Sequence, residues 1–123
     1  MNRTILEKHM SKLAHFFRFS LAEDYSILII RDFQLPPGFN RKITPVWIEI
    51  PKDYPESPPG VGDSRVYVPK GLEFRGRIPN DYHPHKGPRG WAWWCYESID
   101  WDPCKDDLLV FCELLRTHMT NPT

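Results

Sequence analysis

The sequence predicts an α+β fold, and three observations point to it. Apolar residues near the N-terminus recur at helical spacing, short β-branched runs separated by turn residues occupy the middle of the chain, and a second apolar stripe at helical spacing lies near the C-terminus. Consecutive strands flanked by helices are typical of an antiparallel sheet with helices on one side. We expect a single domain over residues 1–123, ordered as N-terminal helix, four-stranded antiparallel meander, long active-site loop and C-terminal helix.

The two helices are predicted from their start signals and their apolar stripes. Thr4 and Glu7 have the spacing of a capping box, so the first helix is expected to begin at Thr4. Its apolar face contains Ile5, Leu6, Met10 and Leu13. The last helix is expected to begin with Asp102 as its N-cap and Pro103 in its first position. Its buried stripe contains Leu108, Phe111, Cys112 and Leu115.

Four strands are expected between the helices, over residues 16–21, 25–33, 45–50 and 65–68. The third alternates most clearly, with Val46, Ile48 and Ile50 on one face. A rigid proline-rich loop over residues 51–62 follows it. Residues 69–92 are expected to be mostly irregular, and a loop of that length in a small domain usually carries function.

The composition argues against several classes of function. Sixteen Lys and Arg residues balance sixteen Asp and Glu residues, so the net charge does not favour nucleic acid or an anionic membrane. No apolar run approaches the roughly 20 residues of a membrane span, and Arg3, Glu7 and Lys8 interrupt any signal-peptide pattern. Three cysteines without a CxxC pair argue against a secreted disulfide framework and favour a cytoplasmic location.

Two motifs, tens of residues apart and in the same order, resemble the ubiquitin-conjugating enzyme family. The stretch from Ile48 to Pro59 is similar to the family's strand followed by Tyr-Pro-x-x-Pro-Pro. His83-Pro84 matches the first two positions of its His-Pro-Asn motif, Cys95 its thioester-forming cysteine, and Trp101-Asp102-Pro103 the Trp-x-Pro that opens a helix. The resemblance covers about residues 4–122.

The chain departs from the family pattern at two places. His85 stands where the motif has asparagine, and the chain ends near Pro122 without the two further C-terminal helices that are usual in the family. Both departures favour a compact, bacterial-type member. By resemblance, we expect a pathway that serves antiviral defence against phage.

The resemblance implies an acyl transferase. The enzyme would accept a ubiquitin-like protein from an activating enzyme onto Cys95 as a thioester and pass it to an amine, in most cases a lysine of a protein substrate. Thioester chemistry requires cysteine, because the thiolate attacks one thioester and the product stays reactive towards amines. No metal or small cofactor is expected, since ATP is used by the activating enzyme. Nucleic acid and membrane are not expected partners.

The three cysteines have competing interpretations. Cys95 follows an irregular loop, which favours exposure, but a free cysteine among tryptophans is also often a buried apolar residue. Cys104 is expected in the first turn of the last helix, where the helix dipole favours a thiolate while Asp106 and Asp107 oppose it. Cys112 lies on the apolar stripe and is expected in the core.

Further site residues are expected around Cys95. His83 is expected to hold the loop by a hydrogen bond. The negative charge that forms on the carbonyl oxygen needs a donor, for which His85 is the first candidate, Asn80 the second and backbone amides a third. Asp100 is the candidate for orienting the incoming amine.

Two alternatives remain open from the sequence. The chain is either an enzyme or a binding module of the same fold without a thioester, and the loss of the motif asparagine favours the module. A zinc-stabilised interaction domain would use His83, His85, Cys95 and Cys104, but their spacing fits no common pattern of paired ligands.

Overall fold

The computed structural model describes residues 1–96 and 100–122. It has an N-terminal helix, a six-stranded sheet and a C-terminal helix. The elements are α1 (Arg3–Leu13), β1 (Phe19–Leu21), β2 (Ile27–Gln34), β3 (Ile43–Glu49), β4 (Val66–Pro69), β5 (Tyr82–His83), β6 (Trp91–Trp94) and α2 (Leu108–Met119). The α+β class and the order of its two helices are as the sequence predicts.

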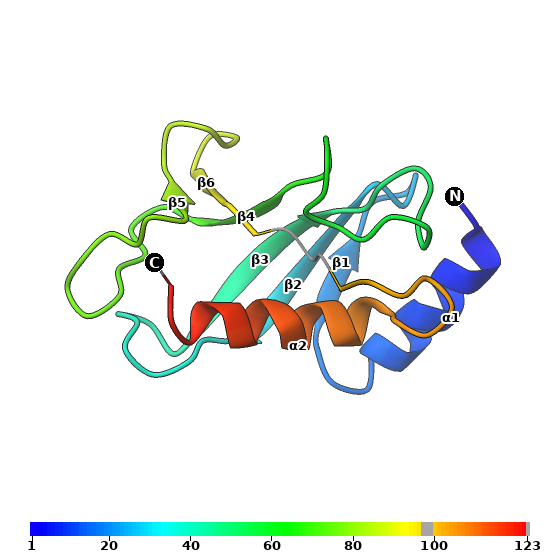
Figure 1. Cartoon of the computed structure of the whole chain (residues 1–123), viewed down its shortest axis with the longest axis horizontal. Coiled ribbons are helices and arrows are strands. Elements are labelled where there is room, and N and C mark those ends of the chain that lie inside the picture. Colours follow the sequence, from blue (N-terminus) through cyan, green and yellow to red (C-terminus); the bar gives the residue numbers. More distant parts are fainter. Residues whose placement is uncertain (97–99, 123) are drawn as a thin grey trace.

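The sheet is antiparallel throughout, in the order β1-β2-β3-β4-β6-β5. In Figure 1, α2 runs along the sheet and α1 lies at one end of it, while the loop before β5 and the C-terminal end of α2 lie at the opposite end. One row of paired residues faces the helices and belongs to the core: Leu28, Ile48, Val66, Trp94 and Tyr82. The neighbouring row, on the other face, is Ile29, Trp47, Tyr67, Trp93 and His83.

The prediction of four strands is wrong, because β5 lies inside the stretch expected to be irregular and β6 begins at its end. Trp91–Trp94 pairs with both β4 and β5. Three of the four residues of β6 are tryptophans, and aromatic residues favour strands. β5 has only two residues, which are too few to show an alternation in the sequence. The first strand is also shorter than expected, since β1 begins at Phe19 and Phe16 is 62% exposed.

The first helix is capped two residues earlier than the capping-box prediction. Asn2 is the N-cap, and its side-chain oxygen accepts a hydrogen bond from the Ile5 N–H at 3.1 Å. Asparagine and threonine both cap helices, so a cap two positions upstream displaced the expected one. The expected apolar face is present, with Leu6, Met10 and Leu13 buried.

The last helix begins later than predicted, and Asp102 does not cap it. Asp107 is the N-cap, and its carboxylate accepts a hydrogen bond from the Val110 N–H at 2.9 Å. Asp102 instead stabilises a turn, accepting from the Cys104 N–H at 2.9 Å. Asp102 and Pro103 carry the signals of a helix start, but the same acceptor chemistry also forms local turns. The predicted stripe of Leu108, Phe111, Cys112 and Leu115 is confirmed as buried.

Candidate functional site

Cys95 follows β6 directly and lies beside the strand that opposes it. Its backbone N–H donates to the Asp81 carbonyl oxygen at 2.8 Å, which extends the pairing of β5 and β6 by one residue. Cys95 has intermediate exposure. The hairpin therefore fixes the backbone of the cysteine while its side chain stays partly accessible.

The side chains around Cys95 alternate between the two faces of the sheet. Trp94 is fully buried, and the Tyr96 ring contacts α2, with its centroid 6.0 Å from Phe111 and 4.7 Å from His118. The residue between them faces the other way in an extended chain. Cys95 is thus placed on the same face as Trp93, away from the two helices.

Arg65 is a residue near this site that the sequence analysis missed. Val66 pairs with Trp94, so one further step of the antiparallel register brings Arg65 opposite Cys95. Its guanidinium lies 4.3 Å from the centroid of the Trp93 ring, and the Lys86 Nζ lies 5.8 Å from the same centroid. Two cations therefore flank the ring that neighbours the thiol. The sequence could not reveal this, because the pairing of β4 with β6 was not expected.

The proline-rich loop approaches Cys95 from its C-terminal side. A Cβ on Gly60 would lie 2.5 Å from the Tyr96 carbonyl oxygen, and the φ of Gly60 is +89°. Both observations require glycine at this position, because a side chain would collide with backbone and strain the loop. Earlier in the same loop, the Pro55 carbonyl oxygen accepts a hydrogen bond from the Trp101 Nε1 at 2.7 Å. The two segments that resemble the family motifs are therefore in contact.

His83 lies on the same hairpin as Cys95, opposite Trp93, and His85 lies on the loop beyond. The His83 ring is 4.9 Å from the Trp93 ring, centroid to centroid, and the two planes are tilted by 33°. The carbonyl oxygen of His83 accepts from the Lys86 N–H at 3.3 Å, which begins the turn. His85 is exposed on that turn. The hairpin therefore places His83 against Trp93, two residues before Cys95, and places His85 two residues farther along the loop.

Asn80 and Asp100 lie on opposite sides of Cys95 in the sequence. Asn80 is exposed and precedes Asp81, whose carbonyl oxygen pairs with Cys95. Asn80 is therefore the residue before the one whose carbonyl oxygen accepts the hydrogen bond from the Cys95 N–H. Asp100 is also exposed. Residues 97–99, between Tyr96 and Asp100, fall outside the described residues.

The other two cysteines have different surroundings. Cys112 is 1% exposed, and burial raises the pKa of its thiol to about 12, so it stays protonated at neutral pH. Cys104 is exposed on the turn before α2, not in the first turn of the helix as predicted. Its expected interaction with the start of the helix is therefore wrong.

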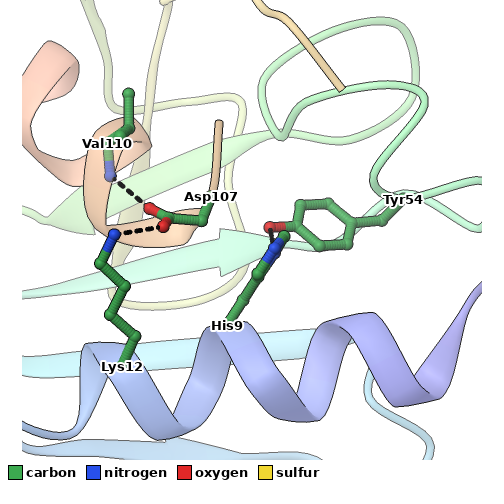
Figure 2. Close-up of polar contacts among 5 residues, drawn as sticks. All are labelled: His9, Lys12, Tyr54, Asp107 and Val110. Carbon is green, nitrogen blue, oxygen red and sulfur yellow. Dashed lines mark hydrogen bonds and ion pairs between the residues drawn. The ribbon is translucent and has the colours of Figure 1, made fainter. Parts of the chain in front are cut away.

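A cluster of polar side chains joins α1, the proline-rich loop and the start of α2 (Figure 2). The carboxylate of Asp107, 7% exposed, pairs with the Lys12 Nζ at 2.8 Å. The Nδ1 of His9 and the hydroxyl of Tyr54 are joined by a hydrogen bond of 2.7 Å. The Lys12 ammonium is therefore held by a carboxylate of the same chain.

Burial and charge act against each other in this cluster. Burial opposes ionisation of Asp107, but the hydrogen bonds from Lys12 and the Val110 N–H, with the Lys12 charge, hold the pKa of its carboxyl below the ordinary value. Burial lowers the pKa of His9, an effect that Lys12 reinforces and Asp107 opposes. The folded protein therefore favours an ionised Asp107 and a neutral His9.

The described residues do not assemble a metal site. Within residues 1–96 and 100–122, no three His, Cys, Asp or Glu side chains are grouped as ligands of an ion. The set of His83, His85, Cys95 and Cys104 is accordingly not gathered at one point. No helix in this part of the chain is long and apolar enough to cross a membrane.

No family model, curated protein or solved structure matches the chain in comparisons of sequence and fold.

Proposed function

We propose that the protein is a ubiquitin-conjugating-like enzyme that carries a ubiquitin-like protein as a thioester on Cys95. The observation that carries the proposal is the position of Cys95 at the end of β6, held by its backbone and facing away from the helices. A nucleophile needs a fixed backbone and an accessible side chain. An activating enzyme supplies the ubiquitin-like protein, and a lysine of a protein substrate receives it.

Comparison of the three thiols supports Cys95 over the others. Cys112 is buried and protonated, which removes it as a nucleophile. Cys104 is exposed, but it lies on a turn outside the paired β-hairpin. Cys95 alone among them combines partial exposure with a position between the hairpin and the proline-rich loop. The bacterial setting and the role in antiviral defence remain predictions from the resemblance.

The nucleophile is tested by thioester formation. Incubation with the cognate ubiquitin-like protein, its activating enzyme and ATP should give an adduct that a thiol reductant removes. Cys95→Ala should abolish the adduct, Cys95→Ser should give a more stable ester, and Cys104→Ala should form the adduct as the wild type does. Normal adduct formation by Cys95→Ala with loss in Cys104→Ala would overturn the assignment.

The oxyanion donor is tested by transfer of the adduct to free lysine. Loss of one donor should leave adduct formation nearly intact and slow transfer by about 100-fold to 1000-fold. If His85 is the donor, His85→Ala should show this separation and His85→Asn should recover much of the rate. The same assay on Asn80→Ala tests the second candidate, and wild-type transfer in both variants would leave backbone amides as the donor. Asp100→Asn tests the amine-orienting role in the same assay.

A binding module of the same fold is the second candidate. The exposed His85 at the motif asparagine position favours it, because that replacement removes the side chain to which the resemblance assigns oxyanion stabilisation. A module would bind the ubiquitin-like protein reversibly, with equal affinity in the wild type and in Cys95→Ala, and would form no adduct. Measurement of both properties on the same pair of proteins separates the two functions.

A further inference from the structure

A tight hairpin at residues 74–77 presents two arginines at the end of the molecule opposite α1. Phe74 and Arg77 exchange both backbone hydrogen bonds, at 2.8 and 3.0 Å. The two residues between them have positive φ, +50° for Arg75 and +76° for Gly76. This geometry matches a two-residue type I′ turn. The arginines therefore lie on a short and well-defined backbone.

The hairpin is fixed to the rest of the protein by a second loop. The Arg75 N–H donates to the Gly38 carbonyl oxygen at 2.7 Å. The Phe74 ring packs edge-on against Phe39, with a centroid distance of 5.0 Å, and a Cβ on Gly38 would lie 2.6 Å from the Phe74 ring. Because these contacts hold the hairpin on its inner side, the backbone that carries the two arginines is arranged before any ligand arrives.

A pocket of about 510 Å³ opens beside the hairpin. Its described lining includes Arg75, Arg77, Asn80 and Ile78, and it contains no Asp or Glu. Ile78 is 65% exposed, so it presents apolar surface at the pocket. The pocket therefore combines two permanent positive charges with an exposed apolar contact, in a chain whose overall charge is balanced.

Arg75 occupies a position where its residue type is disfavoured. Type I′ turns favour asparagine, aspartate or glycine at the first central position, because other side chains are strained at positive φ. Gly76 follows the preference, and Arg75 does not. A residue that breaks a local rule without a structural gain is a marker of function. The guanidinium of Arg75 lies 5.1 Å from the Phe74 centroid, a contact at an exposed site that contributes little.

We propose that this pocket binds an acidic peptide segment that carries carboxylates next to an apolar side chain. Arginine matches carboxylates through paired hydrogen bonds, and Ile78 supplies the apolar contact. A nucleic acid fits less well, because bases stack on open aromatic faces. Phe74 also lines the pocket, but its ring is already packed against Phe39 and lies near the Arg75 guanidinium. The pocket shares Asn80 with the surroundings of Cys95, but the proposal does not depend on whether the chain forms a thioester.

The proposal is tested by nuclear magnetic resonance titration of the ¹⁵N-labelled full chain. The probe is a blocked heptapeptide with one leucine between an aspartate and a glutamate, flanked by glycine and serine. We expect saturable shifts centred on residues 74–80, with a dissociation constant on the order of 1 mM. Replacement of both carboxylates by amides should abolish the shifts, and replacement of the leucine by serine should weaken binding several-fold.

Variants of the two arginines separate binding from stability. Arg75→Asn should weaken binding by about tenfold and raise the midpoint of thermal unfolding by about 2 to 4 °C, because asparagine tolerates positive φ. Arg77→Gln should weaken binding by a similar factor without raising the midpoint. Arg18→Gln, an exposed arginine between α1 and β1, is the matched control and should bind the peptide normally.

Four results would overturn the proposal. Absence of saturable shifts in the wild type would remove the site. Equal shifts with the amide peptide, or tighter binding of a single-stranded oligonucleotide of similar length, would show that an acidic peptide is not the ligand. A lower unfolding midpoint in Arg75→Asn would show that Arg75 serves the stability of the turn.

Discussion

The two ends of α2 are held by different physical means. At its N-terminal end, Asp107 pairs with Lys12 of α1 and caps the helix, in contact with charged and polar groups. At its C-terminal end, His118 accepts a hydrogen bond from the Trp94 Nε1 at 3.3 Å and packs its ring on Tyr96. The first junction joins helix to helix, and the second joins the helix to the strand that leads into Cys95.

We expect the N-terminal junction to affect mainly the stability of the protein, and the C-terminal junction to affect the candidate site at Cys95 as well. The N-terminal junction depends on an ionised carboxylate, so it responds to pH. The C-terminal junction contacts the residues on either side of Cys95, so a change there alters the backbone that carries the thiol. His118 also lies 3.5 Å from the carboxylate of Asp81, whose carbonyl oxygen holds the Cys95 N–H.

The largest effect is expected from Asp107→Ala. It removes the helix cap and the partner of Lys12, and it leaves the Val110 N–H without its acceptor. We expect a loss of about 3 kcal/mol in the free energy of unfolding, measured with urea. Asp107→Asn keeps an acceptor and should lose about 1 kcal/mol. A loss in Glu113→Ala, an exposed position on the same helix, as large as that in Asp107→Ala would contradict the assignment.

A somewhat smaller loss is expected from His118→Ala, at about 2 kcal/mol, because the buried Trp94 Nε1–H loses its acceptor. A second measurement on the same variants is the rate at which iodoacetamide alkylates Cys95, in proteins that also carry Cys104→Ser. This rate should change in His118→Ala and stay at the wild-type value in Asp107→Asn. Equal rates in both variants would show that the two junctions do not differ in their effect on the thiol.

The smallest effect is a pH dependence at the N-terminal junction. The pKa of His9 in the folded protein lies below 6.5, so the folded state binds fewer protons than the unfolded state as pH falls through that region. The stability that His9 contributes is present above pH 6.5 and is lost on acidification. Asp107 adds a further loss below about pH 3.8.

We therefore expect the urea midpoint of the wild type to fall between pH 7 and pH 5, and to fall less in His9→Gln. His15→Gln, at an exposed position just after α1, is the control and should follow the wild type. Parallel curves for the wild type and His9→Gln would contradict the role of His9.

The sequence predicted the elements that depend on repeated patterns. The apolar stripes of both helices and the alternation of β3 are present as expected, because burial of several residues at a fixed spacing leaves a clear signal. The predicted starts of the two helices were wrong, because Asn2, Thr4, Asp102 and Asp107 all have side chains that can cap a helix. Choice among such residues depends on tertiary contacts, such as Lys12 with Asp107, that no local pattern contains.

The candidate site was predictable only in part for the same reason. Cys95 and the His-Pro turn were found from the motif, but the position of Arg65 opposite Cys95 depends on the pairing of β4 with β6. A two-residue strand carries no period, so β5 and the pairing that it completes were not visible. The turn at Arg75 and Gly76 was not predictable either, because Arg75 has a positive φ and arginine is not among the residues that type I′ turns favour.

The contact between Lys12 and Asp107 has a consequence for synthesis of the protein. The two residues are 95 positions apart, and ribosomes add about 5 to 20 residues per second, so α1 emerges roughly 5 to 20 s before α2. During that time Leu6, Met10 and Leu13 have no helix to pack against. During synthesis α1 therefore cannot complete its packing until α2 has left the ribosome, and its apolar face stays without that cover in the meantime.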